Sequence, residues 1–194
     1  MRAIHHHSSA PMKIQAIPRS RHGFTLIEML TVITIIVILA GLVLGGFGFV
    51  KEKQKRSKAE IQVKLLANAC EEFKADNGFY PGINDNTTGD GKNMTKELYS
   101  DLYWDSNRDG SGPKSDSRQH IYISELDPEN NKQGWTDGRG QNVRILDPWN
   151  NEYRYRKGNN ANNPDFDLWS AGPDGKTNPD NPKDKQNRDD VKNL

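Results

Sequence analysis

The sequence predicts an α+β protein in which one long N-terminal helix packs on a small antiparallel sheet with long loops. Residues 24–50 (FTLIEMLTVITIIVILAGLVLGGFGFV) are almost continuously apolar. Residues 61–73 repeat apolar side chains every three or four positions. Residues after 79 combine short strand-like runs with many Asn, Asp, Gly and Pro residues. These patterns are typical of an apolar helix, an amphipathic helix, and short strands joined by loops.

The apolar run at 24–50 is long enough to cross a membrane. As a helix it extends roughly 40 Å at about 1.5 Å per residue, more than the ~30 Å hydrocarbon core of a bilayer. No small-residue cleavage signal follows it, because the basic stretch KEKQKRSK (51–58) begins directly after Val50. We therefore expect residues 24–50 to stay in the protein as a single transmembrane helix.

The charges around this run leave its orientation open. Residues 1–22 hold four bases and no acid, which favours a cytoplasmic N-terminus. The five bases and one acid of 51–58 oppose that orientation. Subtracting these bases and the two acids of 23–58 from the totals of 27 and 26 leaves 18 bases and 24 acids in 59–194. An acidic body gives no support to a nucleic-acid-binding function.

The helix is expected to continue through residues 51–77 as an amphipathic segment. Its apolar stripe comprises Ile61, Leu65, Leu66, Ala69 and Phe73. The sequence DNG at 76–78, followed by Pro81, ends the helix.

Residues 78–194 are expected to form a globular domain of short strands and loops. The strand candidates are His120–Ser124, Val143–Leu146, Glu152–Arg156 and Phe166–Ser170. After Asp174 only Val191 and Leu194 are aliphatic, so the C-terminal tail cannot bury a core of its own. Cys70 is the single cysteine, so no intrachain disulfide can hold this tail.

The sequence RHGFTLIE at 21–28 resembles the processing site of type IV pilin-like prepilins, whose leader ends in Gly before Phe-Thr-Leu-(Leu/Ile)-Glu. The resemblance implies that residues 1–23 are a leader removed by a prepilin peptidase. The peptidase would cut between Gly23 and Phe24 and methylate the new amine of Phe24. Glu28 would become the fifth residue of the processed chain.

Glu28 places a lone carboxylate in an apolar helix, where a charge is energetically unfavourable. Glu28 costs about 2.5–3.5 kcal/mol near a bilayer centre, and less near its edge. The segment offers no cationic side chain as a partner. The ammonium of Phe24 on a neighbouring subunit is a natural counter-ion, and this pairing would set the axial register between subunits. The alternative is that Glu28 lies among the lipid headgroups.

Three further segments resemble the major pseudopilin family of type II secretion: DNGFYP at 76–81, DPWNNEYRY at 147–155 and FDLWSAGPDG at 166–175. The resemblance covers about 24–81 and 147–175, and hardly touches 82–146. It implies a pilin-like fold and a structural subunit, not an enzyme.

By the same resemblance, the subunit would assemble with copies of itself and with minor pseudopilins into a periplasmic helical filament that helps to export folded proteins. It would also meet the prepilin peptidase and an inner-membrane assembly platform. The chain would cross the bacterial inner membrane once, with its N-terminus cytoplasmic and its C-terminal domain periplasmic.

The family resemblance also implies a calcium ion that clamps the C-terminal loop. The carboxylates of Asp174, Asp189 and Asp190 and the backbone carbonyl of Ala171 would supply the oxygen ligands that calcium prefers. The segment 176–188 is longer than usual in the family, and the alternative is a solvated acidic tail.

A second, weaker calcium candidate is the sequence DSNRDG at 105–110, which matches the first six positions of an EF-hand loop through Asp105, Asn107 and Asp109. The twelfth position holds Asp116 in place of Glu, and Pro113 interrupts the loop. An Asx-rich turn is the alternative.

Other function classes remain open. A true type IV pilin of a surface filament, used in adhesion, motility or DNA uptake, is the nearest alternative, but such pilins often close their C-terminal region with a disulfide. A membrane-tethered enzyme is disfavoured, because the sequence shows no nucleophile elbow, phosphate loop or zinc-spaced His/Cys set. A calcium-binding adhesive module would be separated by sugar-binding or surface-binding assays.

Overall fold

A computed structural model describes residues 23–82, 90–110, 112, 119–131 and 133–193. The predicted leader up to His22 and the loop positions Pro113 and Asp116 lie outside these residues. The chain forms two compact units, Met1–Gly46 and Phe47–Leu194.

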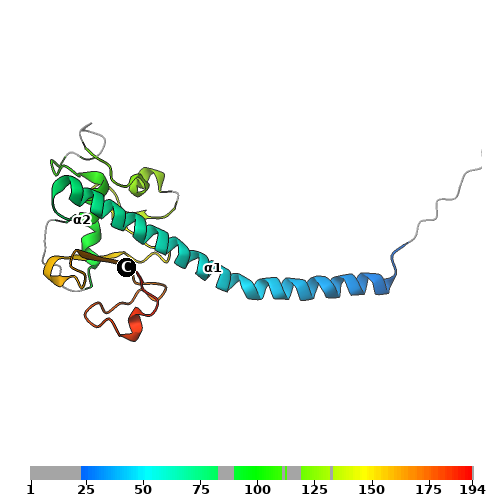
Figure 1. The fold of residues 1–194 in the computed structure, drawn as a ribbon. Coiled ribbons are helices and arrows are strands. Elements are labelled where there is room, and N and C mark those ends of the chain that lie inside the picture. Colours follow the sequence, from blue (N-terminus) through cyan, green and yellow to red (C-terminus); the bar gives the residue numbers. More distant parts are fainter. Residues whose placement is uncertain (1–22, 83–89, 111, 113–118, 132, 194) are drawn as a thin grey trace, which may run out of the picture. The chain divides into compact units, whose positions relative to one another are not determined.

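Helix α1, Leu26–Asn77, confirms the predicted long N-terminal helix (Figure 1). In the first unit, every residue from Gly23 to Val43 is exposed. Among the described residues, α1 is the one helix long and apolar enough to cross a membrane. The helix ends where the sequence predicts, because Gly78 adopts a left-handed φ of 81° and its N–H donates to the Lys74 carbonyl at 2.7 Å.

The C-terminal half of α1 supplies the core of the second unit. Figure 1 shows this half, cyan to green, lying along the folded part of the chain. Its buried stripe comprises Ala59, Val63, Leu66, Ala69, Cys70 and Phe73. The predicted stripe was wrong at Ile61 and Leu65, which are 58% and 38% exposed. A sequence pattern with spacings of three and four fits two neighbouring stripes, and the packed partner decides between them.

Two small antiparallel sheets complete the α+β fold. Strands β1 (Thr136–Asp137) and β2 (Arg144–Ile145) pair with each other. The second sheet has the order β3-β4-β5, with β3 at Arg154–Lys157, β4 at Phe166–Ser170 and β5 at Val191–Lys192.

The predicted strands are confirmed unevenly. β4 has its predicted bounds, β2 lies inside Val143–Leu146, and β3 begins two residues later and ends one residue later than the predicted Glu152–Arg156. The strand at His120–Ser124 was wrong: Tyr122 donates its N–H to Leu102 at 3.0 Å, and a 3-10 turn, Ser124–Leu126, follows. Of the three consecutive apolar residues in this segment, Tyr122 and Ile123 pack on the core, and the Tyr122 and Phe73 rings lie 5.3 Å apart, whereas Ile121 is exposed.

The region 82–146 is folded where it is described. Helix α2 (Thr95–Tyr99) runs into a π-helical turn (Ser100–Trp104), and Leu98, Tyr99 and Leu102 are fully buried. The remaining short helical elements are 3-10 turns at Lys92–Met94, Pro128–Asn130, Gly158–Asn160 and Lys185–Asn187.

Candidate functional site

The predicted processing motif lies at the beginning of α1. Gly23 and Phe24 precede the helix, and the Phe24 side chain is 79% exposed. Thr25 is the residue before the first helical turn and Glu28 is the third helical residue, the spacing of a capping box. The helix therefore begins at Leu26, two residues later than expected.

Glu28 and Thr25 satisfy each other's polar groups. The Glu28 Oε2 atom accepts from the Thr25 backbone N–H at 2.7 Å and from its hydroxyl at 2.8 Å. The Glu28 N–H donates back to the Thr25 Oγ1 at 3.3 Å. The carboxylate thus has partners within the isolated chain, but these are neutral, and its charge is uncompensated by any described side chain of the first unit.

The first of the three family-like segments in the second unit, DNGFYP at 76–81, closes α1 against the sheet. The Tyr155 hydroxyl donates to the Pro81 carbonyl at 3.2 Å, and Lys157 Nζ donates to the Gly82 carbonyl at 2.6 Å. Asp101 accepts from the Gly82 N–H at 2.6 Å. These contacts fix the turn that follows the long helix.

The second family-like segment, beginning at Asp147, forms a tight turn around one buried carboxylate. Asp147 Oδ1 accepts from the N–H groups of Trp149 at 2.9 Å and Asn151 at 2.8 Å. Its Oδ2 accepts from the Ser170 hydroxyl on β4 at 2.5 Å. Burial raises the pKa of the Asp147 carboxyl, and the Ser170, Asn151 and Trp149 hydrogen bonds oppose that rise. The turn is therefore fastened to the end of β4, next to the C-terminal loop.

The C-terminal loop brings Asp189 to the turn that follows β4. Gly172 has a left-handed φ of 65°, and a Cβ built on it would lie 2.6 Å from the Asp189 Oδ2 atom. Asp174 donates its backbone N–H to the same oxygen at 3.4 Å. Ala171, whose carbonyl is the fourth predicted ligand, is fully buried beside this turn. The Asp189 carboxylate and the Asp174 backbone thus meet at this turn, whereas the Asp174 carboxylate accepts from the Lys176 N–H at 2.8 Å.

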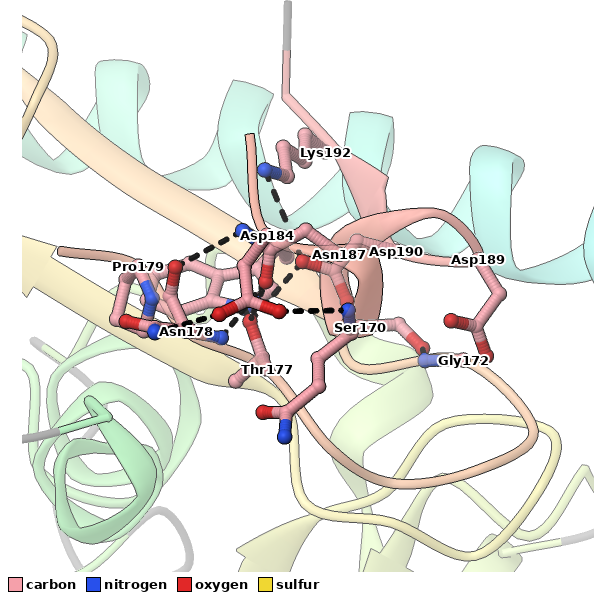
Figure 2. Close-up of polar contacts among 12 residues, drawn as sticks. Ser170, Gly172, Thr177, Asn178, Pro179, Asp184, Asn187, Asp189, Asp190 and Lys192 are labelled. Atoms are coloured by element: carbon pink, nitrogen blue, oxygen red, sulfur yellow. Dashed lines mark hydrogen bonds and ion pairs between the residues drawn. The ribbon is translucent and has the colours of Figure 1, made fainter. Parts of the chain in front are cut away.

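Asp190 faces a different set of groups. Figure 2 shows Asp189 turned towards Gly172, whereas Asp190 lies towards Asn187 and Thr177. Asp190 Oδ2 accepts from the Thr177 hydroxyl at 3.0 Å and lies 3.7 Å from Lys192 Nζ. Burial raises the pKa of the Asp190 carboxyl, and the Thr177 hydroxyl and Lys192 oppose that rise.

The residues of this loop fit a calcium ion in part. The donors are hard oxygens of the kind calcium prefers. Asp190 Oδ1 is buried and has no hydrogen-bond donor among the described residues, which leaves an acceptor for a cation. Within the same described residues, however, no group of three or more His, Cys, Asp or Glu lies close enough to hold a metal ion. Asp189 and Asp190 would therefore have to turn towards one another to share an ion.

In the second calcium candidate, backbone N–H groups of the same loop bind the Asp105 carboxylate. Asp105 accepts from the N–H groups of Asp109 at 3.0 Å and Gly110 at 2.8 Å. Asn107 donates to the Asp109 carboxylate at 2.8 Å. Arg108, with a left-handed φ of 56°, turns its guanidinium away to bind Asp101 at 2.7 Å. The described contacts are those of an Asx turn.

Sequence reasoning did not single out three residues that organise these sites. Thr25 was detectable from the spacing T-x-x-E directly before an apolar run. Asp147 begins the family-like segment at 147–155, but its bond to Ser170 had no signal in the sequence, and neither had the bond of Asp101 to Gly82, because these partners meet only in the folded chain.

Comparisons with known proteins agree with this architecture. Residues 18–44 match the prokaryotic N-terminal methylation motif, and residues 110–189 match the type II secretion system protein G family. The type II secretion system core protein G of Escherichia coli K12 is 31% identical over 157 residues, which cover 80% of this chain and 83% of that protein. This chain belongs to the type II secretion system core protein G family.

Other members of the core protein G family show the same relationship. The Pseudomonas aeruginosa protein is 29% identical over 158 residues, covering 81% of this chain and 87% of that protein. The Aeromonas hydrophila protein is 43% identical over 63 residues, which cover 32% of this chain and 44% of that protein. Among solved structures, the major pseudopilin of enterohaemorrhagic Escherichia coli matches with 24% identity and a TM-score of 0.40, covering 74% of this chain and 85% of that one. Membership of the core protein G family makes the chain a major pseudopilin of type II secretion.

Proposed function

We propose that the chain is cut between Gly23 and Phe24, methylated on the amine of Phe24, and assembled into a periplasmic helical filament that drives protein export. The observation that carries the proposal is the setting of Glu28. It is a lone acid on an apolar helix surface that is exposed throughout its described length in the first unit. Such a surface needs lipid or other helices to cover it, and the acid needs a cation.

Assembly supplies both requirements. The leader keeps the Phe24 nitrogen in a neutral peptide bond, so the uncut chain has no ammonium at this place. The cut creates a positive charge four residues from Glu28. In a filament, the Phe24 ammonium of one subunit pairs with the Glu28 carboxylate of its neighbour and fixes their axial register, while the apolar helices cover each other.

The partners and location follow from the same role. The chain assembles with copies of itself and with minor pseudopilins, after meeting a prepilin peptidase and an inner-membrane assembly platform. Before assembly it spans the inner membrane once, with the leader in the cytoplasm and residues 78–194 in the periplasm. It has no catalytic activity in this role.

The decisive experiment is mass spectrometry of the N-terminal peptide of chain isolated from cells with and without a prepilin peptidase. We expect a chain beginning at methylated Phe24 with the peptidase, and an uncut chain without it. An uncut chain in peptidase-containing cells would refute the processing step. Filaments on the cell surface under native expression would favour a type IV pilin instead of a periplasmic pseudopilin.

The assembly step is tested by Glu28→Gln, which keeps the shape of the side chain and removes its charge. We expect a processed chain that no longer enters sedimentable filaments. Thr34→Val is the matched control, because the Thr34 hydroxyl lies on the same helix and bonds only the Leu30 carbonyl at 2.8 Å. Filaments of normal yield from the Glu28→Gln chain would overturn the proposed pairing.

The C-terminal loop is proposed to bind one calcium ion. Asp174, Asp189 and the Ala171 carbonyl would hold it at the turn after β4, and Asp190 would join them if its side chain turns towards Asp189. The ion would close the tail that has no disulfide. Calcium should raise the melting temperature of the full chain in detergent; Asp189→Asn should abolish that increase, and Asp165→Asn, at an exposed acid outside the loop, should not. An unchanged melting temperature with calcium would refute this part.

A further inference from the structure

A ring of bases surrounds α1 immediately after its apolar segment. This basic collar consists of Lys51, Lys53, Lys55, Arg56 and Lys58. Four of the five residues are exposed, and Lys58 is half-buried. All of them belong to the second unit, which begins at Phe47. Directly before them, the apolar side chains of Phe49 and Val50 are 77% and 62% exposed.

The bases of the collar point in different directions around the helix axis. At about 100° per residue, Lys51, Lys55 and Lys58 fall within about 60° of one another on one face. Lys53 and Arg56 fall about 60° apart on the opposite face by the same geometry. A partner docked on one face would leave the bases of the other face unpaired.

Of the two sectors between these faces, one holds the exposed side chains of Gln54 and Ser57, and the other, at Glu52, faces the globular domain. Glu52 is the only acid between 51 and 58, and both of its carboxylate oxygens accept from the Trp149 indole N–H, at 3.0 and 3.2 Å. Ala59, seven residues or about two turns further along at a similar angle, is fully buried in the core. The acid is therefore turned towards the globular domain and away from the bases.

The bases find little compensation within the described part of the chain. Arg56 makes an exposed pair with Glu60 at 3.7 Å and approaches the Asp189 carbonyl at 3.5 Å. Lys58 donates to the Gln133 carbonyl at 2.8 Å. Lys51, Lys53 and Lys55 make no ion pair or side-chain hydrogen bond among the described residues.

We propose that the basic collar binds the phosphate groups of anionic phospholipids in the leaflet next to the globular domain. A layer of headgroups around a crossing helix meets the bases on both faces, as the collar requires. Bases adjoining a membrane span are attracted to an anionic surface. The positive-inside rule disfavours bases on the periplasmic side, where the expected orientation places the collar. Lipid binding would give these bases a role there.

The collar acts before assembly and independently of the cut, so its test uses the uncut full chain. The chain is reconstituted in phosphatidylcholine vesicles with a minority of phosphatidylglycerol, and energy transfer is measured from its tryptophans to dansyl-labelled phosphatidylglycerol or phosphatidylcholine. Transfer to the anionic probe should be stronger, and this preference should weaken with added salt. Circular dichroism checks that each variant melts as the wild type does.

The test variant replaces all five collar bases with Gln. The matched control replaces five exposed lysines elsewhere in the globular domain: Lys92, Lys96, Lys176, Lys183 and Lys185. We expect the preference for phosphatidylglycerol to fall by about fivefold or more in the collar variant, since one base at an anionic surface contributes about that factor. The control variant should keep it.

Three outcomes would overturn the proposal. The first is an equal preference for the two lipids in the wild-type chain, and the second is an unchanged preference in the collar variant. The third is a preference lost equally in the collar and control variants, which would show a general effect of net charge. If the lipid preference is absent and the collar variant instead loses chemical cross-links between copies, the collar binds a second copy of the chain and not lipid.

Discussion

The Tyr153 hydroxyl donates a hydrogen bond of 2.8 Å to Gln62 Oε1, and both side chains are buried. Gln62 lies on α1, beside the buried stripe, and Tyr153 directly precedes β3. The bond therefore joins the long helix to the sheet at a polar point inside the core. Burial raises the pKa of the Tyr153 hydroxyl well above its usual range, so it stays a donor at all physiological pH values.

Tyr153→Phe should destabilise the globular unit by about 1–3 kcal/mol, because Gln62 Oε1 would remain buried without a donor. Thermal denaturation of the full chain in detergent measures the loss. Tyr122→Phe serves as a control, since its hydroxyl contacts the exposed groups of Asp76 and Asn77. An equal melting temperature for Tyr153→Phe and wild type would mean that water replaces the missing donor.

Arg108→Gln should also destabilise the unit, by about 3 kcal/mol. Arg108 holds the Asp101 carboxylate with two nitrogens, at 2.7 and 3.1 Å, and the Asp101 side chain is only 4% exposed. Removing the guanidinium leaves a buried carboxylate whose other partner among the described residues is the Gly82 N–H. Arg56→Gln, at an exposed pair, should change the free energy of unfolding by less than about 1 kcal/mol. Chemical denaturation of both variants makes the comparison, and similar small losses would contradict it.

The sequence predicts the longer elements of this fold better than its two-residue strands. The DNG turn ends α1 because glycine supplies the left-handed residue that helix ends favour, and β4 was found because its five residues are extended and apolar enough to stand out. β1 and β5 have two residues each, too few for any periodic pattern. β1 forms only by pairing with β2 a few residues later, and β5 only by pairing with β4 more than twenty residues earlier.

The candidate sites divide in the same way. The pair Thr25 and Glu28 is local, so spacing alone contains the information. The C-terminal loop depends on tertiary contacts: Asp147 and Ser170 meet across 23 positions, and neighbouring Asp189 and Asp190 face different groups. The chain bends at Asp189, just before β5, so the two adjacent acids face different groups, which a list of acids in a sequence does not convey.

Without calcium, acid should stabilise the chain through Asp190. Burial raises the pKa of this carboxyl above the value near 3.8 that it has when exposed, so the folded chain holds the proton more tightly than the unfolded chain. Its contribution is fully present below the unfolded pKa and is lost as the pH rises through the folded pKa. Burial shifts the pKa of Asp147 in the same direction.

Asp190→Asn isolates the Asp190 part of this dependence. Melting temperatures are measured between about pH 4 and about pH 7 in a calcium chelator. As the pH rises, the melting temperature should fall less for the variant than for the wild type. The slope that remains in the variant comes from Asp147 and the other acids. Equal slopes of melting temperature against pH for the variant and the wild type would contradict the prediction, because they would show that ionisation of Asp190 does not change the stability of the folded chain.

Thr25→Val should loosen the beginning of α1. Valine has nearly the same shape as threonine, and its backbone N–H can still donate to Glu28, but its side chain can neither donate to the Glu28 carboxylate nor accept from the Glu28 N–H. Loss of such a cap costs about 1 kcal/mol, so the amides of the first helical turn should exchange about fivefold faster with solvent. Hydrogen exchange of the full chain in detergent micelles, followed by mass spectrometry of the N-terminal peptide, measures the change.

The conservative variant Thr25→Ser keeps the hydroxyl and should exchange at the wild-type rate, while Thr34→Val controls for the loss of a hydroxyl elsewhere on the apolar helix.

The same variants connect the cap to assembly. In the uncut chain Glu28 has Thr25 as its partner, and after the cut it can pair with an ammonium. If Thr25 only caps the helix, Thr25→Val chains that are processed should still form filaments, because the Phe24 ammonium satisfies Glu28 there. Processed Thr25→Val chains that form none would show that Thr25 acts within the filament as well.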